Sequence, residues 1–155
     1  MSKVKLSIPV AFLIENLRTS GEPKDVIIEC IKKQDFTLLL DKVKEKTMDF
    51  KERCQTAEDI GDEWEEAILS GYEFKFLHIN GLKRLLYFRF DRAIDRDYEQ
   101  DGITLKNLYL DPIEIDTLQG LIGRQWQVIA EDNEAAGNVQ TSVSIKLLYR
   151  NEDDS

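Results

Sequence analysis

The spacing of the apolar residues changes at Gly71. Before this glycine, apolar side chains recur every three, four or seven positions, as at Phe50, Cys54 and Ala57, which is typical of amphipathic helices. After it, apolar and polar residues alternate, most regularly over 139–149, which is typical of strands with one buried face. This order predicts an α+β fold, in which a helical N-terminal half precedes a mostly antiparallel sheet of about five strands.

Capping and turn residues give the expected elements. Helices are expected between Ser7 and Gly21, from about Glu22, over 36–46, over 47–70 with Gly61 as a candidate break, and from Asp111 to about Ile122. Strands are expected over 72–79, 82–90, 103–110, 125–131 and 139–149.

The change of spacing also predicts how the chain is organised. At 155 residues it suits one domain. Residues 1–71 are expected to form a helical region, and 72–150 an antiparallel α+β region of order β-β-β-α-β-β that packs with it as one compact unit. Residues 151–155 read as an acidic tail.

Asn80-Gly81 is the strongest local turn signal in the chain. This dipeptide suits a type I′ turn, so 72–79 and 82–90 are expected to pair as a hairpin. In that pairing most aromatic side chains share one face while Lys75 and Arg84 lie on the other. Nucleic-acid binding by a sheet needs basic and aromatic groups together, so a core hairpin is favoured over a nucleic-acid surface. A groove for a small anion remains as an alternative, and its candidate residues are Arg84, Tyr87 and Arg89.

The formal net charge of −9 limits the class of partner. An acidic protein repels phosphate backbones and suits a basic protein surface, so direct nucleic-acid binding is not expected. Acidic residues concentrate in 58–66 and 95–101, where a solvated surface is the simpler interpretation and a partner-binding surface the functional one. The candidate partner-binding residues are Asp59, Asp62, Glu63, Glu65, Glu66, Asp95, Asp97, Glu99 and Asp101.

The residues that support metal or nucleophilic chemistry are sparse. The single histidine, His78, and the two cysteines, Cys30 and Cys54, have unrelated spacings, so neither a metal site, a cofactor nor a catalytic triad is expected. Both cysteines are expected as buried free thiols in a reducing cytosol. The short apolar run 8–14 predicts neither a signal peptide nor a membrane span, so a cytoplasmic location is expected.

Three segments carry a resemblance to a known group of proteins. They are Ile8-Pro9 before a short helix, the run WEEAILSGYEF at 64–74, and the capped helix start at 110–115. This order resembles small uncharacterised accessory proteins encoded by phages and prophages of Gram-positive bacteria. The resemblance implies a small phage product that acts inside a bacterium and binds or redirects a host protein, and it supplies no catalytic residues.

Three hypotheses follow for the function. The leading one is a non-catalytic binding protein that inhibits a host defence or nucleic-acid-processing protein through an acidic surface. The alternative is a protein that sequesters a small anionic ligand, such as a signalling nucleotide. A carboxylate enzyme that uses Asp111 and Glu114, or the 95–101 cluster, is the third, although the first two residues are expected as helix caps. A homodimer through a free sheet edge is left open.

Overall fold

The computed structural model describes residues 4–130 and 140–148. The described elements, in chain order, are β1 (Val4–Leu6), α1 (Ile8–Arg18), α2 (Lys24–Lys33), α3 (Phe50–Ile60), α4 (Trp64–Ser70), β2 (Tyr72–Phe74), α5 (Ile79–Phe90), β3 (Glu99–Asp101), β4 (Thr104–Leu110), α6 (Pro112–Ile122), β5 (Trp126–Ala130) and β6 (Thr141–Leu147). The α+β class is therefore confirmed, with helices first and an antiparallel sheet later in the chain.

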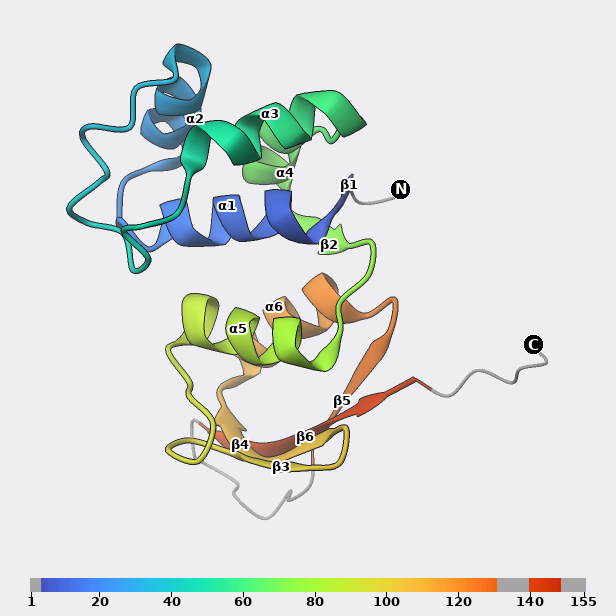
Figure 1. Ribbon diagram of the computed structural model, residues 1–155. Helices are drawn as coiled ribbons and strands as arrows, with labels where there is room; N and C mark the ends of the chain where they lie inside the picture. The colour runs from blue at the N-terminus through green and yellow to red at the C-terminus, as the bar shows by residue number, and fades with distance from the viewer. Residues whose placement is uncertain (1–3, 131–139, 149–155) are drawn as a thin grey trace.

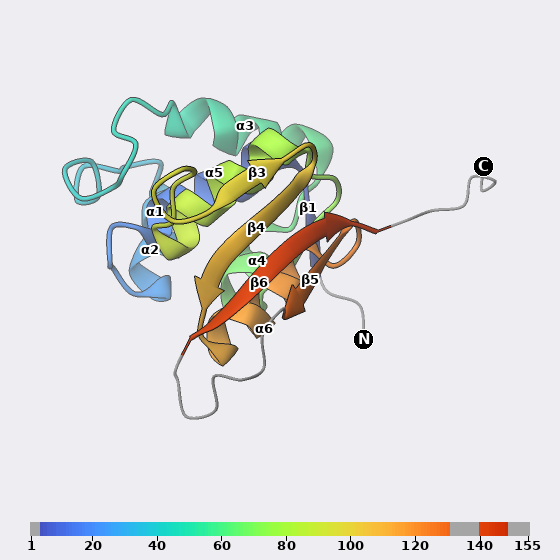
Figure 2. The ribbon, with the colours of Figure 1, turned by 90° about the horizontal axis from the view of Figure 1, so that it is seen from below.

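The elements form three layers (Figure 1). Helices α1 to α4 lie together with a short parallel pair, β1 and β2, at one end of the molecule. Helices α5 and α6 form the middle layer, and an antiparallel sheet of order β3-β4-β6-β5 forms the other end. Seen from below in Figure 2, the sheet lies in front of the helices, so α5 and α6 cover its inner face.

Helix α1 lies at the centre of the core. All residues from Val10 to Leu17 are buried, which places this helix between other elements on every side. The Phe12 ring lies 5.6 Å from that of Phe74 on β2 and 5.8 Å from that of Phe88 on α5, measured between centroids. Through Phe12, α1 therefore joins the first layer to the middle one.

The hairpin predicted around Asn80-Gly81 is wrong. Strand β2 ends at Phe74, and the predicted second strand is part of helix α5. His78 caps this helix, because its Nδ1 accepts a hydrogen bond of 2.9 Å from the Gly81 amide. The apolar residues of this segment also fit a helix, since the buried Leu82, Leu85 and Leu86 recur at three- and four-residue intervals.

Strand β2 pairs with the N-terminus of the chain instead. Strand β1 runs parallel to it, with Val4 opposite Tyr72 and Leu6 opposite Phe74. The backbone continues this pairing, because the Lys75 amide donates to the Leu6 carbonyl at 2.9 Å. A strand of three residues is too short to show alternation, so β1 could not be predicted from the pattern of apolar residues.

The helix predicted over 36–46 is also wrong, because this segment forms successive turns. Phe36, Leu39 and Val43 are buried at helical spacing, which explains the prediction. Two side chains of the α1 region hold the backbone in another conformation. The Asn16 side chain bonds both the amide and the carbonyl of Glu45, each at 2.9 Å, and the Thr19 hydroxyl accepts from the Lys44 amide at 2.8 Å.

The remaining boundaries agree with local sequence signals. Gly61, at φ +74°, separates α3 from α4, and Gly71 follows α4. Asp111 and Glu114 form the predicted capping box at the start of α6. The acidic loop contains one unexpected strand, β3, which pairs with β4 through Glu99 and Lys106. Strands β5 and β6 correspond to the strands predicted over 125–131 and 139–149. Positions 131, 139 and 149 of these predictions, and the predicted tail 151–155, lie outside the described residues.

Candidate functional site

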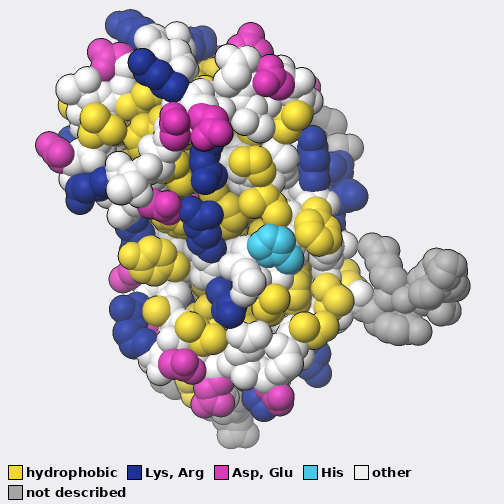
Figure 3. All heavy atoms as spheres, viewed as in Figure 1, with side chains coloured by type: hydrophobic (Ala, Val, Ile, Leu, Met, Phe, Trp, Pro, Cys, Tyr) yellow, Lys and Arg dark blue, Asp and Glu magenta, His cyan; other side chains and the backbone are white. Residues whose placement is uncertain are grey.

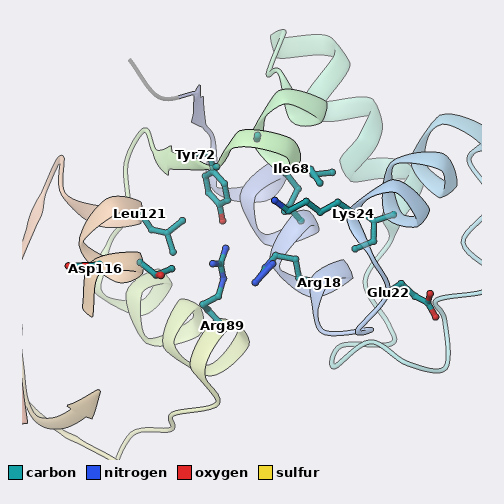
Figure 4. Close-up of a pocket in the computed structure, with 13 residues that line it drawn as sticks. Arg18, Glu22, Lys24, Ile68, Tyr72, Arg89, Asp116 and Leu121 are labelled. Atoms are coloured by element: carbon teal, nitrogen blue, oxygen red, sulfur yellow. The ribbon is translucent and has the colours of Figure 1, made fainter. Parts of the chain in front are cut away.

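A cavity of about 320 Å³ lies between the first and middle layers. Helices α1, α2 and α4 border it on one side and α5 and α6 on the other, with Tyr72 of β2 between them (Figure 4). Its apolar wall is formed by Ile14, Ile27, Ile68 and Leu121. Three basic residues, Arg18, Lys24 and Arg89, also line it, so the cavity combines an apolar surface with a group of cations.

A buried ion pair adjoins this cavity, and one of its two members, Arg89, lines the cavity wall. Arg89 donates to Glu15 through two hydrogen bonds, from Nε to Oε1 at 2.8 Å and from Nη2 to Oε2 at 2.7 Å. The Glu15 side chain is 1% exposed and that of Arg89 16%, and the Tyr72 hydroxyl donates to Oε2 of Glu15. This arrangement links α1, β2 and α5 through Glu15, Tyr72 and Arg89, which we call the Glu15 cluster.

The Glu15 cluster changes the protonation equilibria of its members. Burial alone would lower the pKa of Arg89, but the hydrogen bonds and the negative charge of Glu15 outweigh burial and raise that pKa. Burial raises the pKa of Tyr72 well above its ordinary value, and the charge of Glu15 adds to this effect. The Tyr72 hydroxyl therefore stays protonated and remains a donor to Glu15.

Arg18 differs from Arg89 because it forms no ion pair with the described residues. It lies three residues after Glu15 on α1, and its side chain points toward the end of Arg89 in Figure 4. Among residues 4–130 and 140–148, no carboxylate forms an ion pair with Arg18 and no group accepts a hydrogen bond from its guanidinium. Arg18 is exposed at the molecular surface, although part of its side chain is buried. This burial, together with the charge of Arg89, lowers the pKa of Arg18.

The other charged residues around the cavity place positive and negative charge on different sides. Lys24 directs its ammonium group into the cavity in Figure 4 and donates to the Leu69 carbonyl at 3.4 Å. Glu22 is paired with Lys42 and lies away from the centre. Asp116 lines the α6 side and has no ion-pair partner within the described part of the chain. Arg18 and Lys24 thus give the other side an excess of positive charge.

The three residues predicted for a small anion are not brought together. Arg89 lines the cavity, but Arg84 and Tyr87 do not. The Arg84 guanidinium pairs with Glu45 at 2.6 Å and lies 5.0 Å from the Phe12 ring, so it serves packing instead. Tyr87 is exposed beneath the ammonium group of Lys44, 4.2 Å from its ring centroid. This part of the prediction is corrected because 82–90 is a helix, whose residues face several directions.

Sequence reasoning missed Arg18, Lys24 and Tyr72. The position of Arg18 in the sequence could have indicated a role, because this residue ends a largely apolar helix and lies one turn after the acidic Glu15. Lys24 and Tyr72 carried none, because they reach the cavity only through the packing of α2 and β2 against α1.

Asp62 is not a surface residue, contrary to the prediction. Its Oδ2 accepts hydrogen bonds from the amide and the hydroxyl of Ser7, both at 3.0 Å, and its Oδ1 accepts from the Lys75 ammonium group at 2.9 Å. The Asp62 side chain is 2% exposed. Ser7 occupies the predicted N-cap position of α1, but its hydroxyl bonds Asp62 instead of capping the helix. Asp62 therefore fixes the start of α1.

The rest of the acidic segment 58–66 lies on the surface. Asp59, Glu63 and Glu66 are exposed, whereas Glu65 pairs with Lys32 at 3.3 Å. Two large apolar side chains of this region are also exposed: Ile60, at 47%, ends α3, and Leu69, at 50%, lies on α4, where it lines a hollow with Glu63 and Glu66. We call Asp59, Ile60, Glu63, Glu66 and Leu69 the α3–α4 patch.

The second predicted acidic segment lies elsewhere. Asp97 accepts hydrogen bonds from the Ala93 amide at 2.8 Å and from Nε of Arg96 at 2.7 Å, and these bonds lower the pKa of Asp97. Asp101 pairs with Lys106 at 3.3 Å, while Asp95 and Glu99 are exposed. This segment adjoins the sheet, at the opposite end of the molecule from α3 and α4 (Figure 1). On the face shown in Figure 3, acidic and basic side chains are interspersed, so the two segments do not form one acidic surface there.

The structure also places the residues considered for metal or thiol chemistry. Both cysteines are free thiols, with Cys30 buried and Cys54 half-buried. Within the described ranges, no group of three or more His, Cys, Asp or Glu side chains could hold a metal ion. In the same ranges, no helix has both the length and the apolar character needed to cross a bilayer.

Comparisons with protein-family models, with curated proteins and with solved structures found no match to this chain.

Proposed function

We propose that the protein binds a small organic anion in the cavity between α1, α2, α5 and α6. The observation that carries this proposal is the position of Arg18. It faces the cavity beside Arg89 and has neither an ion pair nor a side-chain hydrogen bond with the described part of the protein. The positive charge of Arg89 acts on Arg18 more strongly than the negative charge of Glu15, and an anion between the layers would offset this repulsion.

The chemistry of the cavity suits this class of ligand. An arginine guanidinium offers a planar set of donors that matches the oxygens of a carboxylate or a phosphate. The apolar wall, including Ile27, Ile68 and Leu121, would contact the body of the ligand. Small-molecule sites usually have volumes of about 300–1,000 Å³. The cavity, at about 320 Å³, suits a compact compound. Sequestering such a compound is the simplest use of a binding site of this kind.

Replacing Arg18 with glutamine should weaken anion binding by about tenfold or more, because a charge-assisted hydrogen bond to the ligand is lost. The measurement is thermal unfolding of the wild type and the variant with a panel of small organic acids and phosphate esters, followed by calorimetry of the compounds that stabilise the wild type. A ligand at a hundred times its Kd should add about 2.7 kcal/mol to the free energy of unfolding.

Lys33→Gln is the matched control for this experiment. Lys33 is an exposed cation on α2 that pairs with Glu29 and does not line the cavity. Its replacement should leave the affinity of any compound unchanged. Binding that is equally strong in the Arg18 variant, or a panel in which no compound binds, would contradict the proposal.

A second candidate function rests on the α3–α4 patch. The patch combines two exposed apolar side chains, Ile60 and Leu69, with three exposed acids, of which Glu63 and Glu66 line the same hollow as Leu69. Such a surface would complement a basic protein surface that also has apolar residues. The resemblance to phage accessory proteins favours a host defence or nucleic-acid-processing protein in the bacterial cytoplasm as this partner, with inhibition or redirection as the outcome.

The triple variant Asp59→Lys, Glu63→Lys, Glu66→Lys should abolish salt-sensitive capture of such a partner, because it reverses the charge of the patch and leaves the buried Asp62 intact. The measurement is affinity capture from a Gram-positive bacterial lysate at low and moderate salt. The control is Asp95→Lys with Glu99→Lys, which changes exposed acids at the other end of the molecule. If the triple variant still captures the partner and the control variant does not, the partner binds at the end of the molecule that contains β3 and not at the α3–α4 patch.

A further inference from the structure

We propose that the cavity selects the dianion of a phosphate monoester over singly charged acids. This inference rests on the proposed function, since it names the class of ligand that the same cavity would bind. It follows from the number of unmatched charges and from their positions around the cavity.

The first step is a comparison of cations and carboxylates. Arg89 is matched by Glu15 through two hydrogen bonds, and Glu22 is matched by Lys42 outside the centre of the cavity. Arg18 and Lys24 are left without a carboxylate partner within residues 4–130 and 140–148. The cavity side formed by α1 and α2 therefore has two positive charges to be matched. A monoanion bound on this side would match one of them, whereas a dianion would match both; Asp116, the cavity carboxylate that forms no ion pair with the described residues, lies on the opposite, α6 side.

The second step is the arrangement of the donors. Arg18 comes from the end of α1 and Lys24 from the start of α2, and in Figure 4 both extend toward the space beside Arg89 and Tyr72. A planar carboxylate offers two oxygens in one plane. A phosphate monoester offers three terminal oxygens in three directions, and it carries close to two negative charges at neutral pH because its second pKa is about 6. It can therefore accept from a guanidinium fork and an ammonium group at once.

The third step concerns orientation. Asp116, on the α6 side, carries a negative charge that repels a phosphate, so it directs the phosphate toward Arg18 and Lys24. The ester group would then extend along the apolar wall made by Ile68 and Leu121. Because this wall would contact an organic group, an organic phosphate should bind more tightly than inorganic phosphate.

The experiment compares four probes by calorimetry at about pH 7.5, where the monoester is mostly dianionic. Phenyl phosphate and phenyl sulfate have nearly the same shape but different charge, benzoate is a planar monoanion, and inorganic phosphate lacks the organic group. Phenyl phosphate should bind at least about tenfold more tightly than each of the other three. Arg18→Gln and Lys24→Gln should each weaken phenyl phosphate binding by about tenfold, and both positions are at the rim of the fold rather than in its core.

Asp116→Asn provides a further check. Removing the repulsive charge should leave phenyl phosphate affinity unchanged or increased, and a decrease would overturn the proposed orientation. A different result is that phenyl sulfate or benzoate binds as tightly as phenyl phosphate and loses the same affinity in the Arg18 variant. That result would overturn the selectivity for a phosphate dianion and leave the proposed binding of small anions intact. If inorganic phosphate binds as tightly as phenyl phosphate, the inference that the ligand has an organic group in contact with the apolar wall is overturned. No binding by any probe, or binding unaffected by both variants, would overturn the proposed function as well.

Discussion

Replacing Arg89 with alanine should lower the free energy of unfolding by about 3–5 kcal/mol, because the Glu15 carboxylate would stay buried without its counter-ion. The Glu15 side chain is 1% exposed, so in the wild type its charge is stabilised by the two hydrogen bonds from Arg89 instead of by hydration. The Tyr72 hydroxyl would remain as a neutral donor that matches only part of the charge. Urea denaturation of the wild type and the variant, followed by circular dichroism, measures the difference.

Two further variants make this result specific to the Glu15 cluster. The double variant Glu15→Leu with Arg89→Leu should recover a large part of the lost stability, because no charge remains buried. Lys33→Ala removes an exposed ion pair with Glu29 and should change the free energy of unfolding by less than about 0.5 kcal/mol. A loss below about 1 kcal/mol for Arg89→Ala would show that Glu15 is not desolvated as the structure indicates.

Asp62→Ala should destabilise the protein by about 2–3 kcal/mol, because it removes a charged acceptor of three hydrogen bonds. The amide and hydroxyl of Ser7 would lose their partner at the start of α1. Lys75 would lose less, because its side chain is 46% exposed and can be hydrated. Thermal or urea unfolding of the purified variant tests this expectation.

Asp59→Ala is the matched control for Asp62→Ala, since the two acids are three residues apart and differ in burial. Asp59 is exposed and accepts one hydrogen bond, of 2.9 Å, from Gln55 on the same helix. Its replacement should change the free energy of unfolding by less than about 0.5 kcal/mol. Equal effects of the two substitutions would remove the distinction between a structural and a surface carboxylate in this segment.

The parts of the fold that the sequence predicts correctly depend on local interactions. The start of α6 is one example, because Asp111 and Glu114 satisfy each other's backbone amides within a single turn. The break at Gly61 is another, since a positive φ is easily adopted by glycine. Such features need no partner from elsewhere in the chain.

The Asn80-Gly81 prediction failed because the apolar residues after this turn signal pack as a helix. An Asn-Gly hairpin requires 82–90 to pair with β2, but β1 pairs with β2 instead. The segment 82–90 then buries Leu82, Leu85 and Leu86 as a helix. A turn signal of two residues cannot report this outcome, because the burial of α5 depends on distant residues, such as Phe12 of α1, which contacts Phe88.

The candidate site was predicted only through Arg89. Its charge suggested an anion contact, but its neighbours in the chain, Arg84 and Tyr87, are not its neighbours in the cavity. Arg18 and Lys24 come from helices more than sixty residues earlier. Asp62 shows the opposite error, because a run of acids suggested solvent exposure whereas a bond to Ser7, 55 residues away, buries it. Side-chain partners of this kind depend on tertiary packing.

The parallel pairing of β1 with β2 has a consequence for the order in which the chain can fold on the ribosome. Strand β1 begins at Val4, and its partner begins only at Tyr72. Helix α1, buried from Val10 to Leu17, must also wait for Phe88 and Arg89 of α5. We therefore expect the side of α1 that packs against α5 to stay exposed until α5 has left the exit tunnel, whereas α3 and α4, which also contact α1, emerge earlier. During that interval the nascent chain presents the kind of apolar segment that chaperones bind.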